Sequence, residues 1–84
     1  MDKQQIFEMI ARIATEVLPE LEGHDFQWTD SLKALGANSM DRSEIVMMTL
    51  EELSLDIPLS ATIKTENIGE LAILLREKYA ELCA

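Results

Sequence analysis

The chain has 84 residues, 48% of them hydrophobic, and 16 acidic side chains against 7 basic ones give it a net charge of −9. This length allows one domain, so we expect residues 1–84 to form a single domain. The charge excludes nucleic acid as a partner, because phosphate would be repelled, and disfavours anionic membrane surfaces for the same reason. We therefore expect partners with basic protein surfaces.

The first predicted element is a helix that ends before Pro19. Pro19 lacks an N–H group and disfavours helical backbone at the residue before it. Apolar residues recur at spacings of three and four along this segment, which is typical of one buried helix face. They are Ile6, Met9, Ile10, Ile13 and Val17.

Residues 19–38 show no long periodicity, and we expect an ordered loop with a short helical turn around residues 31–35. A loop this long in a small domain is often functional. Trp28 is expected to plug the core. His24 is the only histidine and has no cysteine partner, so we expect it at the surface.

A second helix is predicted from Asn38 or Ser39 to about Leu53. Asn38 is a favourable N-cap, and acids in the first turn complement the helix dipole. The inward stripe is predicted to be Val46, Leu50 and Leu53. The outward acids are Asp41, Glu44, Glu51 and Glu52, with Met40 and Met47 on the border of the two faces and Met48 on the acidic side.

The remaining segment predicts a linker and a last helix. Ile57, Leu59 and Ile63 are expected to anchor the linker, and residues 59–64 carry a weak signal for a short third helix, since β-branched residues disfavour it. Thr65 is expected to cap the last helix. Its stripe is Ile68, Leu71, Ala72, Leu75, Tyr79 and Leu82. The fold class is therefore all-α, a small four-helix bundle with a long first connection.

Several enzyme classes lack their required residues. A hydrolytic triad needs a base beside its nucleophile, and only His24 is available. One cysteine and one histidine cannot build a zinc site, and the acids show no EF-hand order. No Gly-rich phosphate loop is present. We therefore expect no catalytic residue, no metal and no enzymatic activity.

The segment most informative about function is residues 35–41, Leu-Gly-Ala-Asn-Ser-Met-Asp. It places Ser39 at the junction of a loop and an acidic helix, where another enzyme could modify an exposed hydroxyl. Serine is also common at helix starts simply as a cap. These residues alone leave both interpretations open.

Together with the acidic helix and the later Ile57-Pro58, residues 35–41 resemble an acyl carrier protein, and the resemblance covers nearly the whole chain. In that family a serine in an Asp-Ser-Leu motif receives 4′-phosphopantetheine from coenzyme A through a phosphopantetheinyl transferase. Ser39 matches that serine. Asn38 and Met40 depart from the usual aspartate and leucine, but neither removes the hydroxyl.

Residues 38–48, 53–58 and 67–72 are similar to the freestanding donor carriers of polyketide β-branching cassettes, such as those of the curacin and bacillaene pathways. The Asp41-Arg42 pair and the double methionine carry most of this similarity. It implies malonyl loading by an acyltransferase, decarboxylation by a ketosynthase, and acetyl donation to an HMG-synthase-like enzyme. The alternatives are a general fatty-acid or polyketide carrier, and an acidic helical interaction module without a prosthetic group.

The second helix is the expected partner face. Its expected partner-binding residues are Met40, Asp41, Arg42, Glu44, Met47, Met48 and Glu51, with Glu52 a further acid that could meet partner cations. For Met40, Met47 and Met48, core filling is the alternative. Arg42 could instead pair with Asp41 or Glu44, or help one synthase select this carrier.

We expect a freestanding, monomeric and cytoplasmic protein. No apolar run reaches the roughly 18 residues of a membrane span, and residues 1–20 do not look like a signal peptide. Cys83, the single cysteine, cannot form an intrachain disulfide, so we expect a passive thiol in a reducing compartment.

Overall fold

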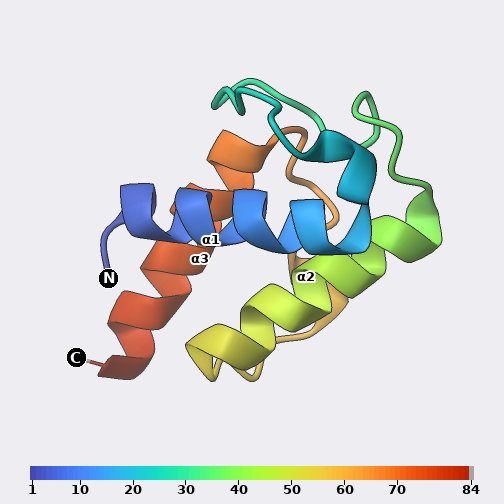
Figure 1. Ribbon diagram of the computed structural model, residues 1–84. Coiled ribbons are helices and arrows are strands. Elements are labelled where there is room, and N and C mark those ends of the chain that lie inside the picture. The colour runs from blue at the N-terminus through green and yellow to red at the C-terminus, as the bar shows by residue number, and fades with distance from the viewer. Residues whose placement is uncertain (84) are drawn as a thin grey trace.

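A computed structural model describes residues 1–83 of the chain, with side chains through residue 81. Within these residues the fold is α1 (Lys3–Val17), a 3-10 helix (Pro19–Leu21), α2 (Ser39–Leu53), a second 3-10 helix (Leu59–Ala61) and α3 (Ile68–Cys83) (Figure 1). The all-α prediction is confirmed. The expectations for the Leu82 side chain and the Cys83 thiol fall outside the described residues.

Helix α1 begins at a reciprocal cap and ends where predicted. The Asp2 carboxylate accepts a hydrogen bond from the Gln5 N–H at 2.8 Å, and the Gln5 side chain accepts one from the Asp2 N–H at 3.0 Å. These bonds satisfy backbone donors that lack a partner within the helix. At the other end Leu18 is the C-cap, directly before Pro19.

The core is built around α1, which crosses α2 and packs against both α2 and α3 (Figure 1). Ile6, Ile10 and Ile13 of α1 are fully buried, and they meet Ile45 of α2 and Leu75 of α3 in one cluster. Burying one such side chain stabilises the fold by about 1.5–3 kcal/mol. The periodic apolar spacing of α1 therefore becomes the centre of the bundle.

Helix α2 buries the predicted stripe of Val46, Leu50 and Leu53. Thr49 lies on the same face, and its hydroxyl is satisfied by the Ile45 carbonyl at 2.8 Å. Met48 is half-buried against the core, so its predicted place on the acidic side is wrong and the core-filling alternative is confirmed for it.

The linker after α2 holds only a three-residue 3-10 helix where a short third helix was predicted. Local hydrogen bonds compete with helix extension here. The Thr62 hydroxyl donates to the Leu59 carbonyl, and the Thr65 hydroxyl donates to the Thr62 carbonyl, each at 2.7 Å. Ile63 is 76% exposed, so the expectation that it anchors the linker is wrong.

The predicted cap of the last helix is also wrong. Because the Thr65 hydroxyl donates to the Thr62 carbonyl, it serves the turn and not the helix. The Asn67 side chain instead accepts a hydrogen bond from the Glu70 N–H at 2.8 Å, one turn later in the chain. Helix α3 therefore begins at Ile68, three residues after Thr65.

The long loop is tied to the start of α3 by backbone hydrogen bonds. The Ile68 N–H donates to the Asp30 carbonyl at 2.8 Å, and the Gly69 N–H donates to the Trp28 carbonyl at 2.9 Å. The first N–H groups of a helix have no intrahelical partner, so the loop supplies their acceptors. Trp28 also stacks on Phe7 with ring centroids 4.5 Å apart, which confirms its expected packing role.

Gly69 makes this close approach possible. A Cβ at this position would lie 2.6 Å from the Trp28 carbonyl oxygen and 3.0 Å from a ring carbon of Trp28. The clash with backbone could be relieved only by moving the loop away from α3.

None of the helices in residues 1–83 combines the length and apolar character needed to cross a membrane.

We predict that Gly69→Ala destabilises the protein by about 1–3 kcal/mol, the usual cost of overpacking. A loss of stability would point to the clash, because alanine is otherwise favoured over glycine in helices by about 1 kcal/mol. Urea denaturation followed by circular dichroism measures the change. Glu77→Ala, an exposed substitution in the same helix, should stay within about 0.5 kcal/mol of the wild type. An unchanged or raised stability of Gly69→Ala would contradict the packing.

Candidate functional site

The site begins with a single helical turn that a glycine ends. The Leu35 N–H donates to the Ser31 carbonyl at 3.0 Å, which confirms the short turn predicted there. Gly36 has φ +104°, and the following Ala37 N–H reaches back to the Leu32 carbonyl at 3.0 Å. This is the pattern of a helix end closed by a left-handed glycine. It ends the turn, and α2 starts three residues after Gly36, at Ser39.

Asn38, not Ser39, is the N-cap of α2. The Asn38 side chain accepts from the Asp41 N–H at 2.8 Å, and the Asn38 N–H donates to the Asp41 carboxylate at 3.4 Å. The cap that the sequence predicts at Asn38 is confirmed. The alternative in which Ser39 serves only as a cap is wrong, because Asn38 already fills that role.

Ser39 is the first residue of α2 and is exposed. Among the described residues, its hydroxyl has no hydrogen-bond partner, so it can react without first breaking a hydrogen bond. The N–H groups of Ser39 and Met40 precede the first intrahelical bond, in which the Arg42 N–H donates to the Asn38 carbonyl. The positive end of a 15-residue helix therefore lies beside the hydroxyl and favours a phosphate there.

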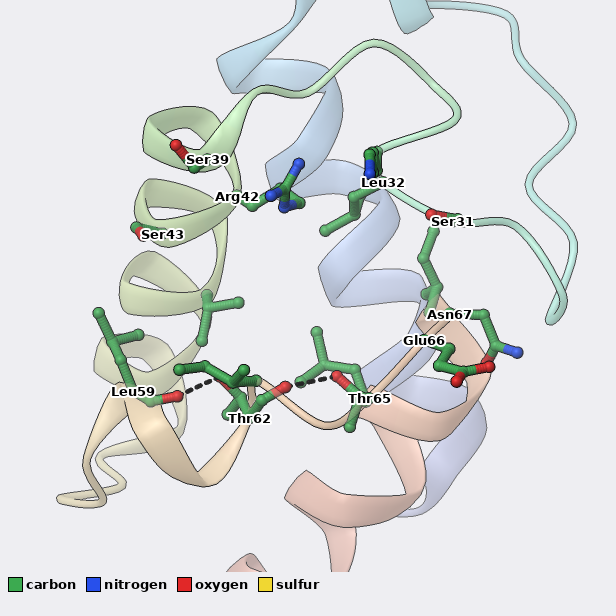
Figure 2. A pocket seen from close by; sticks show the side chains of 15 residues that line it. Ser31, Leu32, Ser39, Arg42, Ser43, Leu59, Thr62, Thr65, Glu66 and Asn67 are labelled. Atoms are coloured by element: carbon green, nitrogen blue, oxygen red, sulfur yellow. Dashed lines mark hydrogen bonds between the residues drawn. The ribbon is translucent and has the colours of Figure 1, made fainter.

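A pocket of about 630 Å³ opens beside this helix start. Figure 2 shows it between the first turns of α2, the loop at Ser31 and Leu32, and the start of α3. Its floor carries Thr62 and Thr65 with their hydrogen-bonded hydroxyls. The pocket joins segments that are distant in sequence, so no local pattern indicates it.

Four of the predicted partner residues form one exposed stripe along α2. Met40, Glu44, Met47 and Glu51 recur at spacings of four, three and four, which places them on one helix face. Met40 is 78% exposed and Met47 is 48% exposed, and both glutamates are exposed. The core-filling alternative for Met40 and Met47 is therefore wrong, and both lie on the exposed face and not on its border, where they were predicted. We call these four residues the Met/Glu stripe.

The other three predicted partner residues are engaged within the chain. Asp41 belongs to the reciprocal cap of α2, and Met48 packs against the core. Arg42 is half-buried, and its guanidinium donates to the Ala37 carbonyl at 2.9 Å. Within the described residues no ion pair joins Arg42 to Asp41 or Glu44, so that alternative is wrong.

Glu52 differs from the acids of the Met/Glu stripe because it has an internal partner. Its carboxylate pairs with the Arg12 guanidinium of α1, and Glu16 pairs with the same guanidinium at 3.1 Å. Glu52 and Glu16 raise the pKa of Arg12. The expectation that Glu52 meets partner cations is therefore not supported, because this carboxylate links α1 to α2. No spacing in the sequence signals such a contact between two helices.

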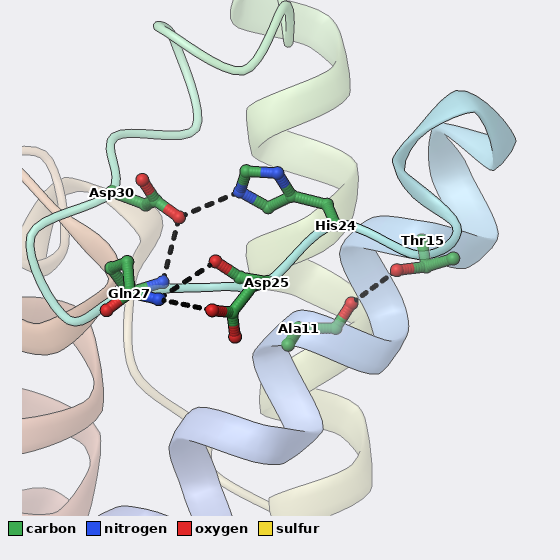
Figure 3. Close-up of polar contacts among 6 residues, drawn as sticks. All are labelled: Ala11, Thr15, His24, Asp25, Gln27 and Asp30. Carbon is green, nitrogen blue, oxygen red and sulfur yellow. Dashed lines mark hydrogen bonds and ion pairs between the residues drawn. The ribbon is translucent and has the colours of Figure 1, made fainter.

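The loop before the site carries a polar cluster around Asp30 (Figure 3). The Asp30 carboxylate accepts from the Gln27 N–H at 2.8 Å and from the ring Nε2 of His24 at 2.9 Å. His24 is exposed, as predicted, and its ring forms a T-shaped pair with Phe26, with ring centroids 4.8 Å apart. The Gln27 N–H, and then His24, hold the pKa of Asp30 below its ordinary value.

A comparison with protein families places residues 6–75 in the phosphopantetheine attachment site family. The chain belongs to this family, and its similarity to acyl carrier proteins makes it an acyl carrier protein, a carrier and not an enzyme. Proteins of the family carry a covalently attached 4′-phosphopantetheine. The exposed, unpartnered hydroxyl of Ser39 beside the open N–H groups of α2 fits such a phosphate-linked group.

Two relatives span nearly the whole chain. The chain is 54% identical to the polyketide biosynthesis acyl carrier protein AcpK of Bacillus subtilis over 93% of its own length and 95% of AcpK. It is 29% identical to the acyl carrier protein of Guillardia theta, over 95% of its length and 99% of that protein.

A solved structure is also similar. It is the crystal structure of the curacin biosynthetic pathway HMG synthase in complex with an acetyl donor acyl carrier protein. The TM-score to a chain of that structure is 0.90 at 46% identity, covering 93% of this chain and 100% of that one.

We predict that Asp30 makes stability fall in acid. A carboxylate whose pKa is lowered on folding stabilises the protein above its unfolded pKa of about 4, and this contribution is lost as pH falls through the lower folded value. Asp30→Asn should therefore make the free energy of unfolding less dependent on pH below about pH 5. Urea denaturation at several pH values measures this dependence. His24→Ala keeps the Gln27 donor and should flatten it less. Identical slopes in the wild type and Asp30→Asn would contradict the assignment.

Proposed function

We propose that Ser39 is the attachment site of the 4′-phosphopantetheine arm. The observation that carries this proposal is the placement of its hydroxyl: exposed, unpartnered among the described residues, and at the first position of a helix that Asn38 caps. Ser43 is the nearest competing hydroxyl and lies one turn into α2. It is removed from the open N–H groups that favour a phosphate.

Attachment is a phosphoryl transfer in which Ser39 is the nucleophile. The Ser39 Oγ forms a bond to the phosphorus that bears pantetheine, and the pyrophosphate P–O bond of coenzyme A breaks. Adenosine 3′,5′-bisphosphate leaves, and the hydroxyl proton is released. When attached, the arm supplies a terminal thiol that carries an acyl group as a thioester. The protein contributes the stiff helix end that holds the nucleophile in the open.

We predict that a phosphopantetheinyl transferase with coenzyme A adds one arm to the wild type and none to Ser39→Ala. Intact mass spectrometry measures the gain. Ser43→Ala is the matched control, because it removes an exposed serine hydroxyl from the same helix, and it should load like the wild type. An arm on Ser39→Ala, or none on the wild type, would contradict the assignment.

We propose further that this carrier donates acetyl in polyketide β-branching. An acyltransferase supplies malonyl, a decarboxylating ketosynthase converts it to acetyl, and an HMG-synthase-like enzyme accepts it. The support is the similarity to a chain of the curacin HMG synthase complex, which this 84-residue chain covers completely, and to AcpK. A general fatty-acid or polyketide carrier is the second candidate, favoured by the Guillardia theta relative. Acetyl transfer from the loaded protein to an HMG synthase separates the two candidates.

The Met/Glu stripe is the surface we propose for docking to that synthase. Its two carboxylates steer an approaching basic surface. The exposed methionines between them supply adaptable apolar contact, which suits a carrier that serves several enzymes. The stripe starts at Met40, directly after Ser39, so a partner seated on it lies next to the arm.

We predict that Glu44→Lys raises the KM of the loaded carrier for the synthase about ten-fold, since it places like charges opposite each other. Steady-state acetyl transfer at low ionic strength measures this change. Glu77→Lys makes the same charge change at an exposed position of α3 and should leave KM unaltered. Equal effects of the two variants would mean that only net charge matters and would remove the stripe as the docking surface.

A further inference from the structure

Arg42 occupies an unusual place for a charged side chain. Residues 42, 45, 46, 49 and 53 fall on one face of α2, and the last four are buried. Arg42 therefore stands at the N-terminal end of the core-facing stripe, not on the exposed Met/Glu stripe. Placing a charge there is costly unless strong hydrogen bonds compensate.

The hydrogen-bond acceptor of the Arg42 guanidinium is a backbone carbonyl. Its Nη1 donates to the Ala37 carbonyl oxygen at 2.9 Å, and within the described residues no carboxylate forms an ion pair with it. Side chains of helical residues lean toward the helix N-terminus, so this guanidinium reaches back over the turn. Figure 2 shows it extending from α2 toward Leu32 across the pocket.

The Ala37 backbone is thereby held on both sides. Its N–H donates to the Leu32 carbonyl at 3.0 Å, and its carbonyl receives the guanidinium. The residue before it, Gly36, is in a left-handed conformation and adds little stiffness of its own. The carbonyl that Arg42 holds belongs to the peptide that leads into Asn38, the cap directly before Ser39.

We infer that Arg42 is a positioning residue for the modification of Ser39. By holding the Ala37 carbonyl it fixes the peptide plane ahead of the cap, and so it steadies the backbone from which the Ser39 hydroxyl extends. Phosphoryl transfer needs the nucleophile aligned with the bond that breaks, and a small misplacement slows such a step severely. This inference rests on the proposal that Ser39 carries the arm.

The test compares loading kinetics for Arg42→Lys, Arg42→Gln and Arg42→Met. Arg42→Met keeps an apolar stem without a donor, so kcat for arm transfer by the transferase should fall roughly ten-fold, with KM for the carrier little changed. Arg42→Lys keeps a charged donor and should recover most of the rate. The carbonyl ¹³C shift of Ala37 in the unloaded protein reports the hydrogen bond directly, and kcat should track it across the three variants.

Lys33→Met is the matched control, because it removes a cation that lines the same pocket and, in contrast to Arg42, forms no side-chain hydrogen bond to Ala37. It should load at the wild-type rate. The inference is overturned if Lys33→Met loses as much rate as Arg42→Met, if the loss is in KM alone, or if kcat does not follow the Ala37 shift. Should Arg42→Met fail to fold, Arg42→Lys and Arg42→Gln still provide that correlation. Loading of Ser39→Ala would instead refute the attachment site itself.

Discussion

The functional end of this protein depends on a helix that starts abruptly. Helix α2 can begin at Ser39 only because the preceding residues are already fixed: Gly36 closes a helical turn in a left-handed conformation, and Asn38 and Asp41 cap each other. The unpaired N–H groups of a helix start cost stability unless something satisfies them. Capping by Asn38 leaves the Ser39 hydroxyl free for chemistry. An attachment site and a stable helix start therefore occupy neighbouring residues without competing.

The long loop between α1 and α2 likewise satisfies the backbone groups at the start of a helix. Its carbonyls at Trp28 and Asp30 accept hydrogen bonds from the first N–H groups of α3, and Trp28 stacks on Phe7 of α1. A loop so bound lies close to two helices that are distant in sequence, and Gly69 is the residue that allows the approach. The loop therefore connects α1 and α3 through its contacts, and it ends in the turn that precedes α2.

The large negative charge is divided between internal and external uses. Asp41 caps a helix, Asp30 organises the loop, and Glu52 pairs with Arg12 across two helices. Glu44 and Glu51 remain on the exposed stripe with two methionines. Net charge alone thus overstates what a partner meets, because only some of the carboxylates are available to it.

Much of this follows from the sequence by itself. The helix periods, the stop at Pro19, the cap at Asn38 and the serine after it are local patterns. The tertiary structure alone decided other features: the burial of Met48, the exposure of Ile63, the pairing of Glu52 with Arg12, and the hydrogen bonds from the start of α3 to the long loop. Each of these depends on which neighbour is in reach once the helices have packed. A one-dimensional pattern specifies which face a residue occupies, but the partner across from that face is set by contacts between segments that are distant in the chain.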